Sequence, residues 1–324
     1  MGDVTFRTIT ADERDAVLDL LHGWLNDRAF FARYFRHDPS FRDDLCFVAV
    51  SGDRLVSTLQ VFTKHVRLDG RVLTVAGVGN VYTDPAYRRR GLAPALLARA
   101  IDAMEREQFD LSLLFATRLE LYGALGWRSH ARHLSFIQPG GGALSGAYRL
   151  EPFDAARDLA AVTALYDTHC RAVTGTTVRD LAYWIGQLAY AGNPHEHFLL
   201  ARHGDEAVAY ARATALYGFN VITEHAALEG HEAALADLVC HLHAASTLPG
   251  TLCQLACEPG FEATLEPRGL EVQTVEDAFW MWRVVNAEQV AAKLRIAPEA
   301  TTAPDFFPRL LPPDRSVYWL SDRF

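Results

Sequence analysis

The chain has 324 residues, half of them hydrophobic, so it can bury substantial cores and is expected to form two domains. Its formal net charge of −9 at pH 7 argues against a general nucleic-acid binder and is compatible with a cationic substrate. No apolar run approaches the length of a membrane-spanning helix, which argues against a membrane partner.

The N-terminus and the cysteines indicate where the protein works. The N-terminus is polar and leads directly into a predicted strand, without the apolar core of a signal peptide. The five cysteines are odd in number and lie mostly in apolar segments, which is typical of reduced, buried thiols. The sequence therefore predicts a soluble, cytoplasmic protein.

The first 138 residues alternate predicted strands and helices. Segments rich in β-formers predict strands at residues 4–8, 45–50, 55–66, 75–82, 111–115 and 133–137. Helical spacing of apolar residues predicts helices at residues 12–24 and 91–106, and a short helix and turn at 117–127. The last of these strands is expected to close a first domain, residues 1–138.

The junction between the central strand and the helix that begins at Gly91 has an unusual composition. Arg88, Arg89 and Arg90 stand directly before this glycine. Backbone N–H groups at a helix N-terminus lack intrahelical partners and lie at the positive end of the helix dipole. Glycine lets an anion approach closely, and arginines add charge-assisted bonds to phosphate. The junction predicts a diphosphate site, whereas a bare arginine triplet would more often be a solvated helix cap.

The second half repeats the order of elements but not the sequence. Residues 139–147, rich in glycine, are expected to form a linker to a second domain at residues 148–285. Its predicted strands and helices lie at residues 148–150, 155–173, 178–189, 197–202, 207–216, 221–226, 231–245 and 251–256. Glu229 and Glu232 occupy the place of the three arginines and would repel a diphosphate. We therefore expect no cofactor site there.

The last segment, residues 286–324, is predicted to contain a helix to about Arg295 and then a proline-rich tail. The tail carries many large apolar residues, which a disordered segment seldom does, so we expect it to pack on the body. These residues are Phe306, Phe307, Leu310, Leu311, Tyr318 and Trp319. The sequence thus predicts an α/β (α+β) fold with two tandem units, each a mostly antiparallel mixed sheet flanked by helices.

The segment from Arg88 to Ala93 resembles the acetyl-CoA signature of the GCN5-related N-acetyltransferases (GNAT), (Gln/Arg)-x-x-Gly-x-(Gly/Ala). It has neither the G-x-G-x-x-G of dinucleotide sites nor the Gly-Lys-Ser/Thr of a P-loop. The resemblance implies acetyl-CoA as co-substrate, with its pantetheine arm and acetyl carbonyl on the backbone of Val81 and Thr83. It also implies that the diphosphate is bound by Arg88, Arg89, Arg90, Gly91, Leu92 and Ala93.

A second motif, from Tyr122 to Trp127, is similar to the family element Tyr-x-x-x-Gly-(Phe/Tyr/Trp). In that family the tyrosine commonly donates a proton to the departing CoA thiolate, which implies that Tyr122 is a general acid. The alternative is a helix residue with its hydroxyl at the surface. The aromatic-rich residues 28–38 favour core packing, although such enzymes place their substrate cleft near this region.

Two acetyltransferase folds with only the first competent resemble the enhanced-intracellular-survival type of aminoglycoside acetyltransferases. There the terminal carboxylate lies in the active site and acts as base, which implies this role for Phe324. The central strand has no carboxylate or histidine between Val78 and Thr83. A packed tail whose last residue faces solvent is the alternative, with Asp322 as fallback base. The chain departs from that family because only residues 286–324 stand where a sterol-carrier-like domain would follow.

The resemblance implies transfer of an acetyl group to a primary amine by direct attack in a ternary complex. The acceptor would be a small-molecule or peptide amine, and homo-oligomerisation stays open. Two alternatives are a non-catalytic acyl-CoA-binding regulator and a tandem enzyme similar to mycothiol synthase, whose active half is the C-terminal one.

No metal is expected, because the candidate ligands lack the spacing of a metal site. These candidates are His195, His197, Cys240, His243, Cys253 and Cys257. Three further acids, Glu120, Asp314 and Asp322, are candidate pocket carboxylates, although single acids on loops usually face water.

Overall fold

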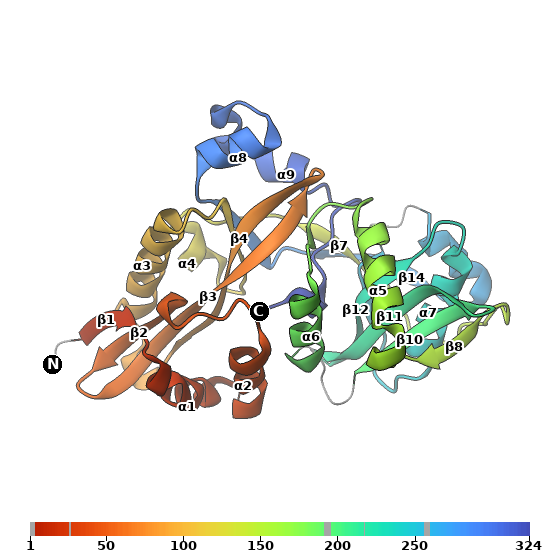
Figure 1. Ribbon diagram of the computed structural model, residues 1–324, viewed down its shortest axis with the longest axis horizontal. Helices are drawn as coiled ribbons and strands as arrows, with labels where there is room; N and C mark the ends of the chain where they lie inside the picture. The colour runs from red at the N-terminus through yellow and green to blue at the C-terminus, as the bar shows by residue number, and fades with distance from the viewer. Residues whose placement is uncertain (1–3, 26, 191–195, 217, 256–259) are drawn as a thin grey trace.

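The computed structural model describes residues 4–25, 27–190, 196–216, 218–255 and 260–324. These residues form two mixed β-sheets flanked by helices, side by side along the long axis of the molecule (Figure 1). The predicted fold class is therefore confirmed. No helix among the described residues is long and apolar enough to cross a membrane.

The first sheet has the strand order β1-β2-β3-β4-β5-β15-β6, and short β9 pairs with β3. All neighbours are antiparallel except β4 and β5, which are parallel because a helix, α3, crosses over between them. The strands are β1 (Val4–Thr8), β2 (Cys46–Ser51), β3 (Arg54–Leu68), β4 (Arg71–Thr83), β5 (Leu111–Phe115), β6 (Arg128–Ser129), β9 (Thr176–Thr177) and β15 (Trp280–Val284).

Helices cover both faces of the first sheet, since alternate side chains of a strand point to opposite faces. On β2, Phe47 packs in the cluster that contains α3, and Val48 packs in the cluster that contains α1 and α2. The α-helices among the described residues of this half are α1 (Arg14–Leu25), α2 (Arg28–His37), α3 (Leu92–Arg106) and α4 (Leu119–Gly123).

The second sheet repeats this topology, with the order β14-β7-β13-β12-β11-β10-β8 and one parallel pair, β12 with β13. Helix α7 connects the parallel strands and packs on the face opposite α5. The elements are β7 (Arg132–Ile137), β8 (Arg149–Pro152), α5 (Ala155–Cys170), α6 (Leu181–Tyr190), β10 (His197–His203), β11 (Glu206–Leu216), β12 (Phe219–Ala227), α7 (Glu232–Ala244), β13 (Thr251–Cys253) and β14 (Val272–Asp277).

The two sheets exchange strands. Strand β7, which covers the residues expected to close the first domain, pairs with β13 and β14 of the second sheet. The vacant position in the first sheet is taken by β15, which pairs with β5 and β6 and buries Trp280 and Trp282. An alternating pattern predicts a strand but not its partner. The domain limits themselves stay a prediction.

The C-terminal segment packs against both halves. It contains α8 (Ala287–Leu294) and α9 (Phe306–Leu310). Phe306 and Phe307 lie in a core cluster of the first sheet, whereas Val317 and Trp319 lie in a core cluster of the second. The chain then ends between the two lobes (Figure 1).

Two buried histidines contact the indole of Trp319. The ring centroid of His225 lies 4.7 Å from that of Trp319, and the centroid of His169 lies 6.1 Å from it. Burial lowers the pKa of His169 to about 4 and the pKa of His225 to about 3. Both rings are therefore neutral in the folded protein at neutral pH.

We predict that the free energy of unfolding falls as the pH is lowered from about 6.5 towards 4.5. Over this range the unfolded chain protonates its histidines, with a pKa near 6.5, while His169 and His225 stay neutral in the folded state. The loss should reach about 3 kcal/mol at pH 5.5 relative to pH 7.5, measured by urea unfolding. His225→Gln should reduce this slope, and the exposed control His241→Gln should not. An equal free energy at both pH values would contradict the prediction.

Candidate active site

The candidate site lies at the point where strand β4 stops pairing with strand β5. The two strands pair from Val75 with Leu111 to Val78 with Leu114, and β4 then continues to Thr83. Its register with β3 shifts after Gly79, and Asn80 adopts a left-handed conformation with φ of 53°. Such a bulge bends a strand and turns it from its neighbour. The bend opens a cleft between the ends of the two strands.

The predicted phosphate loop lies at one end of this cleft. Gly91 is the N-cap of α3 with φ of 77°, and Arg89 has φ of 59°. Left-handed residues within such a turn direct successive backbone N–H groups into one concavity, which suits an anion. A Cβ atom built on Gly91 would meet no atom within 4 Å, so the space in front of the helix N-terminus is open.

The flanking arginines are exposed, and two of them are held by local contacts. Arg88 Nε donates to the carbonyl oxygen of Thr83 at 3.0 Å. Arg90 donates to the carbonyl oxygen of Ala86 at 2.8 Å, and its guanidinium lies 4.7 Å from the ring centroid of Tyr87. These contacts keep positive charge at the mouth of the cleft.

Tyr122 lies on α4 and lines the same cleft. Its ring is half-buried and meets the ring of Trp127 edge-on, with centroids 6.3 Å apart. Burial raises the pKa of Tyr122 above its ordinary value of 10, so the hydroxyl stays protonated at neutral pH. Arg283 of β15 braces the segment after α4, because its Nε donates to the carbonyl oxygen of Leu125 at 3.1 Å. A strand from the second half of the sequence thus supports the tyrosine.

Phe324 lies against β4 at the point where the strands part. A Cβ atom on Gly77 would come within 2.6 Å of the Phe324 ring, and one on Gly79 within 3.2 Å of its terminal carbonyl carbon. The ring also packs on Phe62 and Phe115, with centroids 5.7 and 6.0 Å away. Two glycines in a central strand signal such a close approach, and sequence reasoning did not use this signal.

The residues predicted to bind acetyl-CoA line one cleft of about 1660 Å³ together with Tyr122 and Phe324. Residues that the sequence analysis did not assign to a site also line it. Aromatic side chains of α1 and α2 form one wall, and the second sheet supplies a further wall that no sequence motif marks. These additional residues include Trp24, Phe30, Phe31, Tyr34, Phe115, Glu196, Thr214, Leu216 and Thr223.

The acids proposed as pocket carboxylates lie elsewhere. Asp322 is completely buried, and its carboxylate pairs with the guanidinium of Arg179 at 2.8 Å instead of facing the cleft. The prediction of Asp322 as fallback base is therefore wrong, because an oppositely charged partner distant in sequence holds it. Glu120 and Asp314 are exposed to solvent.

The described residues contain no group of three His, Cys, Asp or Glu side chains that would hold a metal ion. Four of the cysteines are buried free thiols, as predicted: Cys46, Cys170, Cys240 and Cys253. His195 and Cys257, two of the candidate ligands, lie outside the described residues.

The fold agrees with comparisons to known proteins. Residues 5–129 match the family described as acetyltransferase (GNAT) domain. Residues 5–129 are therefore similar to a GNAT acetyltransferase domain, and this stretch contains the loop Arg88–Ala93 and Tyr122. The comparison with curated proteins gives no match.

Several solved structures share the fold over most of the chain. A probable N-acyltransferase from Enterococcus faecalis V583 is 15% identical, with a TM-score of 0.70 over 90% of this chain and 75% of that one. A GCN5-related N-acetyltransferase from Kribbella flavida is 19% identical, with a TM-score of 0.64 over 87% and 71%. Eis1 from Mycobacterium abscessus is 17% identical, with a TM-score of 0.60 over 90% and 76%. At these identities the likeness shows a shared fold.

We predict that Gly91→Glu weakens acetyl-CoA binding by at least about 100-fold, measured by isothermal titration. The new carboxylate would lie in the open space at the helix N-terminus, next to the place predicted for the diphosphate. Repulsion between two such adjacent negative charges costs several kcal/mol. Gly204→Glu is a matched control, because Gly204 also has a positive φ of 62° and open space but does not line the cleft. An unchanged affinity in Gly91→Glu would exclude the loop as the binding site.

Proposed function

We propose that the protein is an acetyl-CoA-dependent N-acetyltransferase that transfers an acetyl group to a primary amine. The observation that carries the proposal is one cleft that joins the phosphate loop, the parted strands, Tyr122 and Phe324. The fit to acetyl-CoA rests on the open, left-handed turn at Arg89 and Gly91. When bound, acetyl-CoA supplies the acetyl group as a thioester.

The cofactor side of the cleft would work through backbone groups. The loop from Arg88 to Ala93 would hold the diphosphate with its N–H groups and arginines. The backbone of Val81 and Thr83, beyond the bulge, would bind the pantetheine arm and polarise the acetyl carbonyl. A preorganised donor at a developing oxyanion is worth roughly 3–4 kcal/mol.

The acceptor side needs a group that takes a proton from the amine as it attacks. The only carboxylate side chains among the described residues that line the cleft are those of Asp27 and Glu196. Asp27 caps α2 by accepting from the N–H of Phe30 at 2.9 Å, and Glu196 pairs with Arg212 at 3.0 Å. We therefore assign the base to the carboxylate of Phe324, next to Gly79. The amine would enter along the aromatic wall of α1 and α2.

The function is tested by measuring CoA thiol release from acetyl-CoA with a panel of polyamines, aminoglycosides and peptides. Release that depends on an amine and yields the acetylated amine by mass spectrometry supports the proposal. Tight binding of acetyl-CoA without release for any amine would favour the alternative of a non-catalytic acyl-CoA-binding regulator.

We predict that Tyr122→Phe lowers turnover by a factor of about 10² to 10⁴ and leaves acetyl-CoA affinity nearly intact. A positioned general acid contributes a rate factor on this order, whereas the phenyl ring keeps the packing on Trp127. Steady-state kinetics and titration check the two halves of the prediction. Tyr148→Phe, outside the cleft, serves as control. The assignment fails if Tyr122→Phe turns over at the wild-type rate.

We predict that three residues added after Phe324 lower turnover at least about 100-fold without loss of acetyl-CoA binding. The extension converts the carboxylate beside Gly79 into an amide, which removes the base. The same three residues added before the N-terminus serve as control. A semisynthetic protein with a C-terminal amide at Phe324 tests the charge alone. Full activity of a folded, extended protein would rule this carboxylate out.

A further inference from the structure

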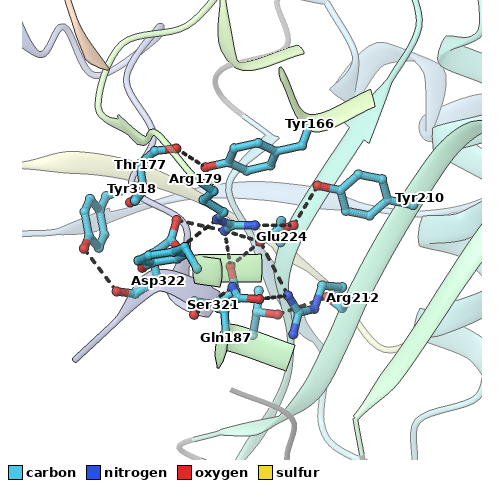
Figure 2. A network of polar contacts seen from close by, with 12 residues as sticks. Tyr166, Thr177, Arg179, Gln187, Tyr210, Arg212, Glu224, Tyr318, Ser321 and Asp322 are labelled. Carbon is cyan, nitrogen blue, oxygen red and sulfur yellow. Dashed lines mark hydrogen bonds and ion pairs between the residues drawn. The ribbon is translucent and has the colours of Figure 1, made fainter. Parts of the chain in front are cut away.

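The further inference rests on the proposed function and concerns how the second half holds the end of the chain. A cluster of buried polar side chains lies between the second sheet and the 3-10 turn Leu320–Asp322 (Figure 2). We call this set the anchor: Arg179, Gln187 and Glu224 of the second half, with Ser321 and Asp322 of the tail.

Arg179 connects the sheet with the tail. Its Nη2 lies 2.6 Å from Glu224 Oε2 on β12 and 2.8 Å from Asp322 Oδ2. Its Nε donates to Asp322 Oδ1 at 3.0 Å, and its Nη1 donates to Glu224 Oε1 at 3.2 Å. One guanidinium thus bridges two carboxylates, one on a central strand and one two residues before the end of the chain (Figure 2).

Ser321 fixes the same turn through its side chain and its main chain. Its Oγ donates to Glu224 Oε2 and accepts from Arg179 Nη2 at 3.1 Å. Its carbonyl oxygen accepts from Gln187 Nε2 at 3.1 Å. Gln187 is oriented in turn, because Arg212 of β11 donates to its Oε1 at 2.6 Å. The turn is therefore held at several points by β11, β12 and α6.

The anchor binds the turn Leu320–Asp322 to the second sheet and also fixes where on the sheet the turn lies. The side chains of Arg179, Glu224 and Asp322 are 0% exposed, and a buried charge without its partner is strongly unfavourable. The turn therefore has one favourable place on a rigid sheet. Phe324 follows this turn after one residue, Arg323, and reaches Gly77 and Gly79 of the first sheet.

We propose that the anchor is a positioning device, through which the second half of the chain sets the location of the Phe324 carboxylate in the cleft of the first half. Arg179, Glu224 and Ser321 are positioning residues that act through residue 324. The second half thereby contributes to the reaction without a diphosphate site of its own.

Two variants test this proposal, each of which removes one hydroxyl group that donates a hydrogen bond to Glu224. Ser321→Ala removes a hydrogen bond between the tail and Glu224. Tyr210→Phe removes a hydrogen bond of 2.6 Å from β11 to the same carboxylate and leaves the hydrogen bonds of Ser321 and Asp322 in place. We expect Ser321→Ala to lower kcat about tenfold with the acetyl-CoA Kd unchanged, and Tyr210→Phe to change kcat by less than about twofold.

A second measurement reads the position of Phe324 without activity. Carboxypeptidase A should release Phe324 about ten times faster from Ser321→Ala than from the wild type, and at the wild-type rate from Tyr210→Phe. Both variants should lose a similar amount of unfolding free energy, measured by urea unfolding. If the anchor only stabilises the fold, the two variants should therefore have equal effects on kcat and on the release of Phe324.

The outcomes separate the inference from the proposed function. If Ser321→Ala and Tyr210→Phe behave alike in kcat and release while the wild type acetylates amines, the anchor is only structural and the inference is overturned. If the wild type binds acetyl-CoA and acetylates no amine, the proposed function fails and the inference falls with it.

Discussion

The pairing of β4 with β5 ends at Val78, and the rest of the site is arranged around the opening that follows. The bulge at Asn80 turns β4 away, which leaves room between the strand ends for a ligand. The predicted phosphate loop lies at one end because it is the direct continuation of β4. Phe324 can reach the parting strands because Gly77 and Gly79 present no side chain to it.

The two halves of the chain contribute to this site in different ways. The first half carries the loop and the tyrosine, and the second half supplies buried charge that holds the tail. Burial opposes ionisation of Glu224, but the guanidinium groups of Arg179 and Arg212 outweigh it and hold its pKa at about 2. The ion pair between Arg179 and Glu224 is thus charged at any physiological pH. The network extends into the first sheet, because the Tyr183 hydroxyl donates to Asp322 Oδ1 at 3.0 Å and accepts from Lys64 Nζ of β3 at 3.2 Å.

Structural features that depend on neighbouring residues could be predicted from the sequence. Features that depend on contacts between residues far apart in the sequence could not. The loop from Arg88 to Ala93 needs six neighbouring residues, and the alternation of strands and helices is likewise local. The exchange of β7 and β15 depends on pairing across the whole chain, which an alternating pattern does not encode. Asp322 was misjudged for the same reason, since its partner Arg179 lies far away in sequence. Thr214 and Thr223 of the cleft wall carry no motif at all.

The strand exchange also constrains how the protein is made. A ribosome completes residues 1–138 first, but the first sheet still lacks the strand between β5 and β6 until residues 280–284 have emerged. During that interval the edge of β5 that later pairs with β15 has no partner strand. Leu111 and Leu113 then lack the packing that Trp280 and Trp282 provide in the folded protein. The first sheet is therefore complete only after residue 284 has been synthesised, and a nascent chain stalled before residue 280 leaves the edge of β5 unpaired.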